Sequence, residues 1–453
     1  MRLLVGCVLV LALAGCTDDA EPEPVDRAIT EVPSSSPSDS VAPSTRPLVL
    51  AVNARRPALA LTLEQARRLR RGAIDDWRRL GQPAGPLRTT ERTVGLRHLP
   101  MDTVAVVSSA AVGPAVRVAT VDGVDPLRDP AAYPLQVAGP TPAEVTTLTV
   151  VGDVMLGRGV TGLPVLEPMS GRLADAELTV GNLESTLSDD GPPRQGGDSF
   201  HAPPSVRGEL RDAGFDAIDL ANNHTGDYGD RALVDTVRLL REGDLPTFGA
   251  GRDLARARKP VVLERDGVRF GFLGFNAIGE TPEAGPGRPG AVSVSMPPRT
   301  GPLDRAELDR FLGDVRRLSR RVDVVVVLPH WGTQYTHRPE PIQHRVARQL
   351  AGAGADLVVG GHPHWVQGAE LVRGPVDDTL VVHSLGNFTF DMTTPQTREG
   401  LVLEATFWGG RLMAANFVPY RMDADLAPRP VPREKAGSIL DPFWELSSLA
   451  APR

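Results

Sequence analysis

Cysteine is nearly absent from the sequence, which contains only Cys7 and Cys16. Cys7 lies inside the apolar run at the N-terminus and would be removed with that run if the run is an export signal. A mature chain that begins at an acylated Cys16 would have no free thiol and no disulfide. We therefore expect packing alone to stabilise the fold.

A long apolar stretch is also missing. The run that follows Met1 and Arg2 is too short for a comfortable membrane span, so residues 1–15 are interpreted as a signal peptide. The run ends in Leu13-Ala14-Gly15-Cys16, which resembles the lipobox of bacterial lipoproteins. The resemblance implies that Cys16 is acylated and anchors an extracytoplasmic protein to the membrane. An ordinary secretory signal with a chance cysteine is the alternative.

A surplus of basic residues is absent as well, because 49 Lys and Arg stand against 56 Asp and Glu, a net charge of -7. Nucleic-acid binders normally carry an excess of positive charge, so nucleic acid is not an expected partner. The length of 453 residues suggests two or three domains. Residues 16–46 are acidic and rich in Ser and Pro, which predicts a disordered linker behind the lipid anchor.

Residues 47–143 predict a small N-terminal α/β domain. A strand at 48–52 is followed by a helix at 61–69, with Thr62 as its N-cap. Several motifs resemble stretches of PstS-like periplasmic phosphate-binding proteins, although the Ser/Thr-Gly segments that would cradle phosphate are not evident. The domain is thus either a degenerate accessory domain or a working solute receptor. The motifs are Leu-Thr-x-Glu-Gln at 61–65, Gly-x-Ile-x-x-Trp at 72–77, Leu-Gly at 80–81, Asp-Gly-Val-Asp-Pro at 122–126 and Tyr-Pro-Leu at 133–135.

Residues 146–420 alternate apolar strand-like runs with amphipathic helices, which predicts an α/β domain. The Pro- and Gly-rich residues 284–302 predict a long surface loop, and residues 421–453 a C-terminal tail. Several of the runs end at or beside Asp, Asn, Glu or His, and ligands of layered α/β folds lie at the carboxyl ends of strands. These runs are 147–153, 178–184, 216–224, 323–332, 356–362 and 380–384.

The polar residues at these strand ends are of the types that hold a hard divalent metal, namely carboxylate, imidazole and amide oxygen. Each also has a plainer interpretation, because a strand-end Asp can cap a turn and a strand-end His can be a hydrogen-bonded core residue. His201, His337, His344 and His383 are interpreted as surface or supporting residues. The metal-type residues are Asp153, Glu184, Asn223, His224, His330, His362 and His364.

Six blocks in this order resemble the CapA family of poly-γ-glutamate capsule synthesis proteins. CapA domains are in turn similar to calcineurin-like metallophosphatases, so the resemblance implies a four-layer α/β/β/α sandwich with metals at the strand ends. The blocks are Gly-Asp-Val-Met-Leu-Gly-Arg at 152–158, Asn-Leu-Glu-Ser at 182–185, Ala-Asn-Asn-His-Thr-Gly-Asp-Tyr-Gly at 221–229, His-Trp-Gly at 330–332, Gly-His-Pro-His at 361–364 and Ser-Leu-Gly-Asn-Phe at 384–388.

The resemblance also implies roles for single residues. The histidine of the Asn-His block, His224, is expected to help catalysis. The residue types add that Glu184, a carboxylate beside cations, is a metal ligand or a general base, and that Arg158 is either an anion clamp or a solvated loop cation. Two departures stand out, because Met155 occupies the place of a second-position histidine and Asn182 that of a bridging aspartate. One or two ions of Mn, Zn, Mg or Fe are therefore possible, and the loss of a bridging carboxylate favours a single or weak site. The expected metal ligands are Asp153, Asn223, His330, His362 and His364.

These features together predict a cell-envelope lipoprotein that synthesises or processes a capsule or poly-γ-glutamate-like polymer. The expected partners are the anionic polymer or its precursor, the membrane through the lipid anchor, and a membrane synthase or export complex. A non-catalytic assembly or export factor is the first alternative, and a solute-binding protein acting through residues 47–143 is the second.

Overall fold

The computed structural model of the protein describes residues 44–140, 142 and 144–451. The predicted signal peptide, the acylation site at Cys16 and nearly all of the predicted linker lie outside these residues. Within the described ranges, no helix combines the length and the apolar character that a membrane crossing requires.

The N-terminal sheet is built around β1, which begins at Thr45, slightly before the predicted start of the domain at residue 47. The predicted helix and its N-cap are confirmed: the Thr62 hydroxyl accepts from the Gln65 amide, and the Gln65 side chain accepts from the Thr62 amide. The elements are β1 (Thr45–Asn53), β2 (Ala60–Leu61), α1 (Leu63–Arg70), β3 (Arg88–Thr90), β4 (Thr103–Ser108), β5 (Val116–Val118), β6 (Thr120–Val121) and β7 (Gln136–Ala138).

The first large sheet has the order β11-β10-β9-β8-β21-β22-β23, and β20 pairs with β8 beyond this path. β8 to β11 run parallel, whereas β21 and β22 are antiparallel to their neighbours. Its strands are β8 (Val145–Val154), β9 (Leu178–Leu183), β10 (Ala217–Asp219), β11 (Thr247–Phe248), β20 (Asn387–Thr389), β21 (Glu399–Trp408), β22 (Arg411–Met422) and β23 (Pro428–Pro430).

The second large sheet has the order β13-β14-β16-β17-β19-β18. The run Val324 to Val327 in β16 is buried on both faces, as expected for a central parallel strand covered on both sides. Its strands are β13 (Val261–Arg265), β14 (Val268–Asn276), β16 (Val324–His330), β17 (Leu357–Val359), β18 (Val366–Arg373) and β19 (Asp378–Leu385).

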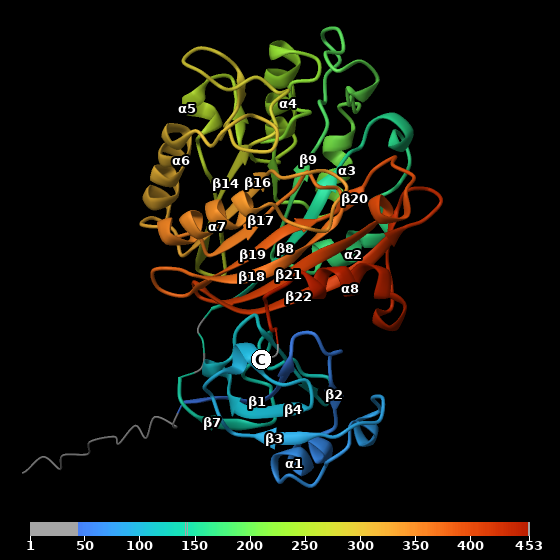
Figure 1. The fold of residues 1–453 in the computed structure, drawn as a ribbon, viewed down its shortest axis with the longest axis vertical. Coiled ribbons are helices and arrows are strands. Elements are labelled where there is room, and N and C mark those ends of the chain that lie inside the picture. The colour runs from blue at the N-terminus through green and yellow to red at the C-terminus, as the bar shows by residue number, and fades with distance from the viewer. Residues whose placement is uncertain (1–43, 141, 143, 452–453) are drawn as a thin grey trace, which may run out of the picture. The chain divides into compact units, whose positions relative to one another are not determined.

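The two large sheets pack face to face and helices cover their outer faces (Figure 1). Leu148 and Val150 of β8 share one buried cluster with Val324 and Val326 of β16, which lies between the sheets. The helices α2, α3 and α4 pack on the first sheet, and α6 and α7 on the second. The predicted four-layer α/β/β/α sandwich is therefore confirmed. The helices are α2 (Glu167–Ala174), α3 (Val206–Asp212), α4 (Asp230–Glu242), α5 (Leu254–Ala257), α6 (Arg305–Leu318) and α7 (Pro341–Ala353).

Two segments are more integrated than the sequence predicts. Residues 284–302 are not a surface loop, because β15 (Gly290–Ala291) pairs with β12 (Ala250–Gly251) and Val292, Val294 and Met296 are buried. Their apolar side chains alternate along an extended chain and pack beside α6, a pattern that the surrounding Pro and Gly obscure.

The predicted C-terminal tail also belongs to the packed body. β23 pairs with β22, and α8 (Gly437–Glu445) places Phe443 and Trp444 in the cluster between the large sheets. The ring of Phe443 lies 4.6 Å from that of Phe417. Residues 421–451 are therefore not a loose tail, because β23 extends the first sheet and α8 buries Phe443 and Trp444 in its core.

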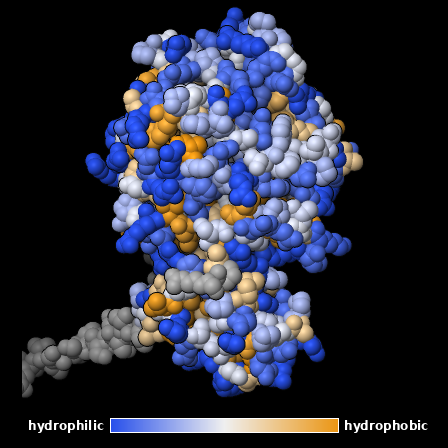
Figure 2. Space-filling model, in the orientation of Figure 1, coloured by the Kyte–Doolittle hydropathy of each residue, from blue (hydrophilic) through white to orange (hydrophobic). Residues whose placement is uncertain are grey.

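The outer surface in view is mainly hydrophilic, with hydrophobic residues scattered over it (Figure 2). The large hydrophobic side chains exposed among the described residues come from separate elements, so they do not define one apolar face. They are Val94, Met101, Val262, Tyr335 and Val376.

Candidate functional site

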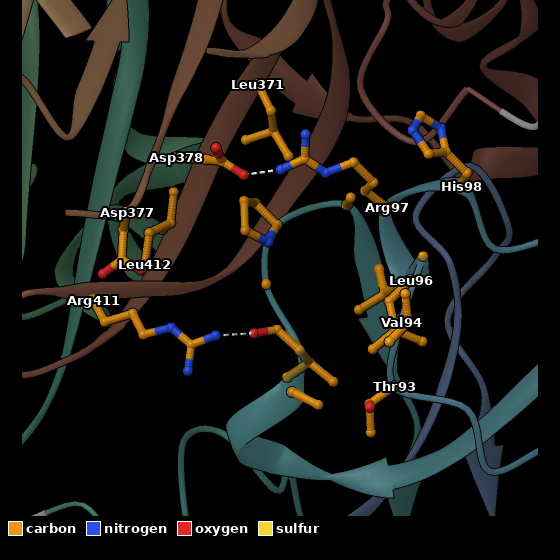
Figure 3. Close-up of a pocket in the computed structure, with 17 residues that line it drawn as sticks. Thr93, Val94, Leu96, Arg97, His98, Leu371, Asp377, Asp378, Arg411 and Leu412 are labelled. Atoms are coloured by element: carbon orange, nitrogen blue, oxygen red, sulfur yellow. Dashed lines mark hydrogen bonds and ion pairs between the residues drawn. The ribbon is translucent and has the colours of Figure 1, made fainter. Parts of the chain in front are cut away.

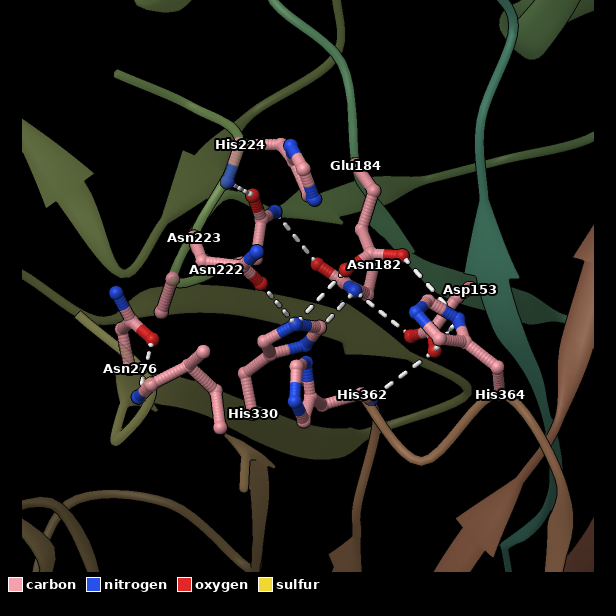
Figure 4. A network of polar contacts seen from close by, with 12 residues as sticks. Asp153, Asn182, Glu184, Asn222, Asn223, His224, Asn276, His330, His362 and His364 are labelled. Carbon is pink, nitrogen blue, oxygen red and sulfur yellow. Dashed lines mark hydrogen bonds and ion pairs between the residues drawn. The ribbon is translucent and has the colours of Figure 1, made fainter. Parts of the chain in front are cut away.

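The predicted site residues lie at the carboxyl ends of parallel strands from both large sheets. Asp153 is near the end of β8 and pairs in register with Asn182 of β9. His330 ends β16, and the Gly-His-Pro-His block follows β17. Parallel strands end at a common edge, which gathers side chains that are far apart in the sequence. The structure brings together Asp153, Glu184, Asn223, His224, His330, His362 and His364 (Figure 4).

Asn182 is the hydrogen-bonding centre of this group. Its Nδ2 donates to Asp153 Oδ1 at 2.8 Å and lies 3.3 Å from His330 Nδ1. Its Oδ1 accepts from Asn222 Nδ2 at 2.8 Å. Asn182 therefore orients an aspartate and a histidine from two different sheets, at the position where the resemblance leads one to expect a bridging aspartate.

Glu184 supplies the carboxylate that Asn182 lacks. Its Oε1 is 2.8 Å from His330 Nε2, and its Oε2 is 3.9 Å from His364 Nδ1. The hydrogen bond of His330 Nε2 goes to Asn223 Oδ1 at 2.9 Å, so neither Glu184 oxygen receives an aligned donor. Burial raises the pKa of Glu184 to about 7. A fully buried carboxylate without donors is unfavourable unless a cation compensates it.

His362 and His364 are held in strained backbone conformations, with φ angles of +92° and +57°. Left-handed φ is uncommon for residues other than glycine and is concentrated at functional sites. The His362 amide donates to Asp153 Oδ2 at 3.0 Å, while both of its buried ring nitrogens lack a hydrogen-bond partner. His364 Nδ1 donates to Asn387 Oδ1 at 2.8 Å. The strained turn thus keeps two imidazoles beside Asp153 and Glu184.

The charge states at the site suit metal binding. Burial lowers the pKa of His330 to about 4 and that of His364 to about 3, so both rings are neutral at pH 7, the form that coordinates metals. Burial, and then the nearby charge of Glu184, raise the pKa of Asp153 to about 7. Binding of a cation would therefore readily displace the protons of Asp153 and Glu184 into solvent.

The donor atoms fall into two groups that share Glu184. Glu184, His330 and His362 form one group, and Asp153, Glu184 and His364 form the other, with the donor atoms of each group within 4.8 Å of one another. The unpartnered atoms of Glu184 and His362 are the ones that a divalent cation would satisfy. The residues present therefore fit a divalent metal. The nitrogen and oxygen donor set suits ions such as Mn, Fe or Zn.

Met155 contributes no metal donor of the kind expected from a histidine at its position. Its side chain is fully buried in the cluster under α2 and α3, and its sulfur accepts from the Gly157 amide at 3.1 Å. This departure from the metallophosphatase pattern removes one imidazole from the site, and the structure fills the space with core packing.

His224 forms a pair with Asp227, which the sequence analysis did not select. His224 Nδ1 donates to Asp227 Oδ2 at 2.9 Å. Asp227 is fixed in turn by Gln195 Nε2 at 2.6 Å and the Phe200 amide at 2.7 Å. The Phe200 ring stacks on His224 with centroids 3.7 Å apart. The sequence does place Asp227 three residues after His224 in the same block, residues 221–229, and this short spacing could have suggested the pair.

Arg158 lies next to this pair without contacting the metal-type residues. Its Nε donates to Asp391 Oδ2 at 3.0 Å, and a second ion-paired contact joins it to Asp391 Oδ1. The guanidinium lies 4.3 Å from the centroid of the Phe200 ring, on which His224 stacks. Arg158 is therefore a partly buried, paired cation at the rim, and its role as an anion clamp stays a prediction.

The site is almost closed to solvent. All seven metal-type residues are buried, and the most accessible of the seven are Asn223 and His224, which are 4% and 5% exposed. Tyr335, which is half exposed, stacks over His364 with ring centroids 5.9 Å apart. Only a narrow group, such as a chain end, would reach these donors without displacement of the covering side chains.

A larger cleft, of about 460 Å³, lies elsewhere and contains none of the predicted site residues. It is lined by residues 93–98 and 111–116 together with side chains of β18, β19 and β22 (Figure 3). Its arginines are already paired, Arg97 with Asp378 and Arg411 with the carbonyls of Ala110 and Val112. This cleft therefore gives no support to a phosphate site in the N-terminal residues.

Comparison with known proteins finds relatives for the large domain. Residues 147–392 match the family described as bacterial capsule synthesis protein PGA_cap. The capsule biosynthesis protein CapA of Bacillus anthracis is 30% identical over 300 residues, which cover 64% of this chain and 70% of that protein. The PGA biosynthesis protein CapA of Bacillus subtilis is 28% identical over 271 residues, or 58% and 67% of the two chains. A solved phosphatase from Mycoplasma pneumoniae is 12% identical with a TM-score of 0.40, covering 66% of this chain and 99% of that one.

The matched residues include every predicted metal ligand, together with His224 and Glu184. They begin at residue 147, so the PstS-like resemblance of residues 47–143 stays a prediction. The resemblance to CapA is confirmed, and the chain belongs to the PGA_cap family of bacterial capsule synthesis proteins.

Proposed function

We propose that the protein acts in the synthesis or processing of a capsule or poly-γ-glutamate-like polymer, by metal-assisted hydrolysis or transfer at the strand-end site. The relatives named for capsule and poly-γ-glutamate biosynthesis support the process. The observation that carries the chemistry is the Glu184 carboxylate, which is buried, without hydrogen bonds, and shared by two groups of metal-type donors.

The residues of the strand-end site would have two roles, binding the cation and orienting its ligands. Asp153, Glu184, His330, His362 and His364 would hold the cation, with Asn223 beside His330 as a further oxygen donor. When bound, the cation supplies positive charge that polarises the bond to be broken. Asn182 would keep Asp153 and His330 in place through its hydrogen bonds.

His224 is suited to move a proton. Because its Nδ1 is held by Asp227, the other ring nitrogen is left to give a proton to a leaving group or to take one from an attacking group. The stacked Phe200 ring fixes the imidazole plane. Arg158 would attract an anionic substrate only after exchanging contacts with Asp391.

The burial of the site favours a narrow substrate group. An end of an anionic polymer, or the activated end of its precursor, fits this restriction better than an internal bond of a thick strand. The predicted anchor at Cys16 would keep the protein on the outer face of the membrane, beside a synthase or export complex that handles the same polymer.

Metal content and turnover test the proposal on the purified full-length protein. We expect stoichiometric divalent metal by elemental analysis, and metal-dependent release of product from poly-γ-glutamate or from bis(p-nitrophenyl) phosphate as a phosphodiester probe. The His362→Ala, His364→Ala double variant should lose the turnover and the metal bound at the strand-end site, whereas His98→Ala, outside the site, should lose neither. An intact protein that takes up no metal at micromolar supply would overturn the hydrolytic proposal and favour a non-catalytic assembly or export factor.

Asp227→Asn is expected to lower turnover on the order of 100-fold with little effect on metal content, because the amide no longer favours the Nδ1-protonated form of His224. Steady-state rates and elemental analysis on the same preparation would separate the two effects. Asp230→Asn is the matched control, since Asp230 lies on the surface at the start of α4 with only a long contact of 3.6 Å to Arg194. An unchanged rate in Asp227→Asn would remove His224 from the proton-transfer role.

A further inference from the structure

A second cluster of metal-type side chains lies on the outer face of the second large sheet. His344 projects from α7, Glu370 from β18 and His383 from β19. His344 Nδ1 is 2.7 Å and His383 Nε2 is 3.1 Å from the same oxygen, Glu370 Oε1. Two imidazoles from different elements thus direct a nitrogen at one carboxylate, and their ring centroids are 4.4 Å apart.

We propose that His344, Glu370 and His383 form a second metal site, selective for a borderline transition-metal ion such as Zn²⁺. The donor atoms of the three residues lie within 4.8 Å of one another. None of them belongs to the strand-end site, so the proposal does not depend on the proposed function.

The spacing of the donors is close to that of a tetrahedral zinc site. Zinc bonds to nitrogen and oxygen of about 2.0–2.1 Å place neighbouring ligand atoms about 3.3 Å apart. The observed 2.7 and 3.1 Å would need to widen by about 0.6 and 0.2 Å. Two imidazoles and a carboxylate would then hold three corners of the tetrahedron and leave the fourth for water or an external ligand.

The environment provides both rigidity and access. His383 is buried, its ring stacks on that of Trp331 at 6.0 Å, and its carbonyl accepts from Trp331 Nε1 at 3.1 Å. The His344 side chain is 35% exposed, so an ion can enter from solvent on that side. This donor set differs from an all-oxygen site for Mg²⁺ or Ca²⁺, which imidazoles would not favour.

The protonation states also agree with metal binding. Burial lowers the pKa of His383, which keeps its ring neutral. Burial would raise the pKa of Glu370, but hydrogen bonds from His344 and His383 outweigh it and lower that pKa to about 2. The carboxylate is therefore already ionised at pH 7, and an ion can replace the two imidazole hydrogen bonds without removing a proton from Glu370.

Occupation of this site would join α7 to β18, at the edge of the second sheet, and to its neighbour β19. Trp331, which packs on His383, directly follows His330 of the strand-end site. A bound ion would thus tighten the packing behind β16, and the thermal stability of the protein should rise with the logarithm of the ion concentration once the site is largely filled.

The test uses full-length protein in which Glu184→Gln and His362→Ala disable the strand-end site. Titration with Co²⁺, followed by visible ligand-field absorbance, and with Zn²⁺, in competition with a chromophoric chelator, should show one remaining equivalent and a rise in Tm. Adding Glu370→Gln should weaken Zn²⁺ binding on the order of 100-fold. This variant keeps a carbonyl oxygen for both imidazoles, so it preserves packing while removing the anionic ligand.

Two further variants make the outcome decisive. His344→Gln, at a partly exposed helix position, should weaken Zn²⁺ binding to a similar extent, and His98→Gln should leave it unchanged. The proposal is overturned if the Glu184→Gln, His362→Ala protein binds neither Co²⁺ nor Zn²⁺. It is also overturned if adding Glu370→Gln or His344→Gln to that protein leaves its Zn²⁺ affinity unchanged. In the protein with native strand-end residues, His344→Gln alone should still bind metal at the strand-end site, so the metal that it binds measures that site separately.

Discussion

Glu184→Gln is expected to weaken divalent-metal binding at the strand-end site on the order of 10³-fold. Both groups of donors at this site include Glu184, so the change removes an anionic ligand from each of them. Removing one partner from a buried charge pair typically costs about 3–5 kcal/mol, which corresponds to that loss of affinity. Competition with a chelator of known affinity, at pH 7.5, would measure it together with the loss of metal-dependent turnover.

The same substitution should have the opposite effect on the metal-free protein. Burial raises the pKa of Glu184 from 4.5 to about 7, so at pH 7.5 the folded state carries a penalty of about 3 kcal/mol at 1.36 kcal/mol per pKa unit. Glutamine removes this penalty. Urea unfolding in the presence of a chelator should therefore show a more stable variant.

The stability gained by Glu184→Gln should depend on pH in a defined direction. For a carboxyl group whose folded pKa is raised, the penalty is absent below the unfolded value of about 4.5, grows as the pH rises to about 7, and is constant above it. The gain in stability from Glu184→Gln should thus vanish near pH 4. A variant that is less stable at pH 7.5 without metal would contradict the view of Glu184 as an uncompensated charge.

Asp356→Asn is the matched control for a largely buried carboxylate away from the metal. Asp356 precedes β17, at the opposite end from the site, and its Oδ2 accepts from the Val325 amide at 2.8 Å. Burial raises its pKa to about 6, so its replacement should also stabilise the protein at pH 7.5. Metal affinity, in contrast, should not change.

The sequence predicted that the site residues lie close together, because each of them lies at or just beyond the end of an apolar run that specifies a buried strand. Apolar runs such as 324–328 specify buried parallel strands, and a polar residue directly after such a run must lie at the sheet edge. That reasoning located Asp153, His330 and the histidines after β17 without knowledge of any contact between them.

What the sequence could not predict depends on register and backbone strain. A register shift between Val150 and Asp153 in the pairing of β8 with β9 decides which side chains face the site, and a shift of one residue reverses that choice. The arrangement that makes Glu184 common to two donor groups follows from this register. The left-handed conformation of His362 is equally hidden, because nothing in a histidine specifies positive φ.

The pairing of His224 with Asp227 was missed for a different reason. An Asp three residues after a His is common in loops, and only the tertiary contacts from Gln195 and Phe200 distinguish this one. Residues 284–302 were wrongly predicted to be a surface loop because of their Gly and Pro content. Val292 and Val294 in this segment are in fact buried in the core.

Gly171→Ala is the control for a second prediction, that Gly152→Ala destabilises the fold. Gly171 lies within α2, is exposed, and a methyl group there would meet no atom within 4 Å. Alanine is favoured over glycine in a helix by up to about 1 kcal/mol, so this variant should be slightly more stable than the native protein.

Gly152→Ala is expected to destabilise the protein by at least about 3 kcal/mol, the upper range for overpacking in a rigid core. A Cβ atom on Gly152 would overlap the carbonyl oxygen of Gly386, and backbone on both sides leaves no flexible side chain to move. The Asp153 amide donates to that same carbonyl at 3.0 Å, and Asn387, which holds His364, follows it. Separating the two segments must displace donors of the site as well as the sheet. Denaturant unfolding and metal titration should therefore both change in Gly152→Ala, and a variant with native stability and native metal affinity would show that this close approach is not required.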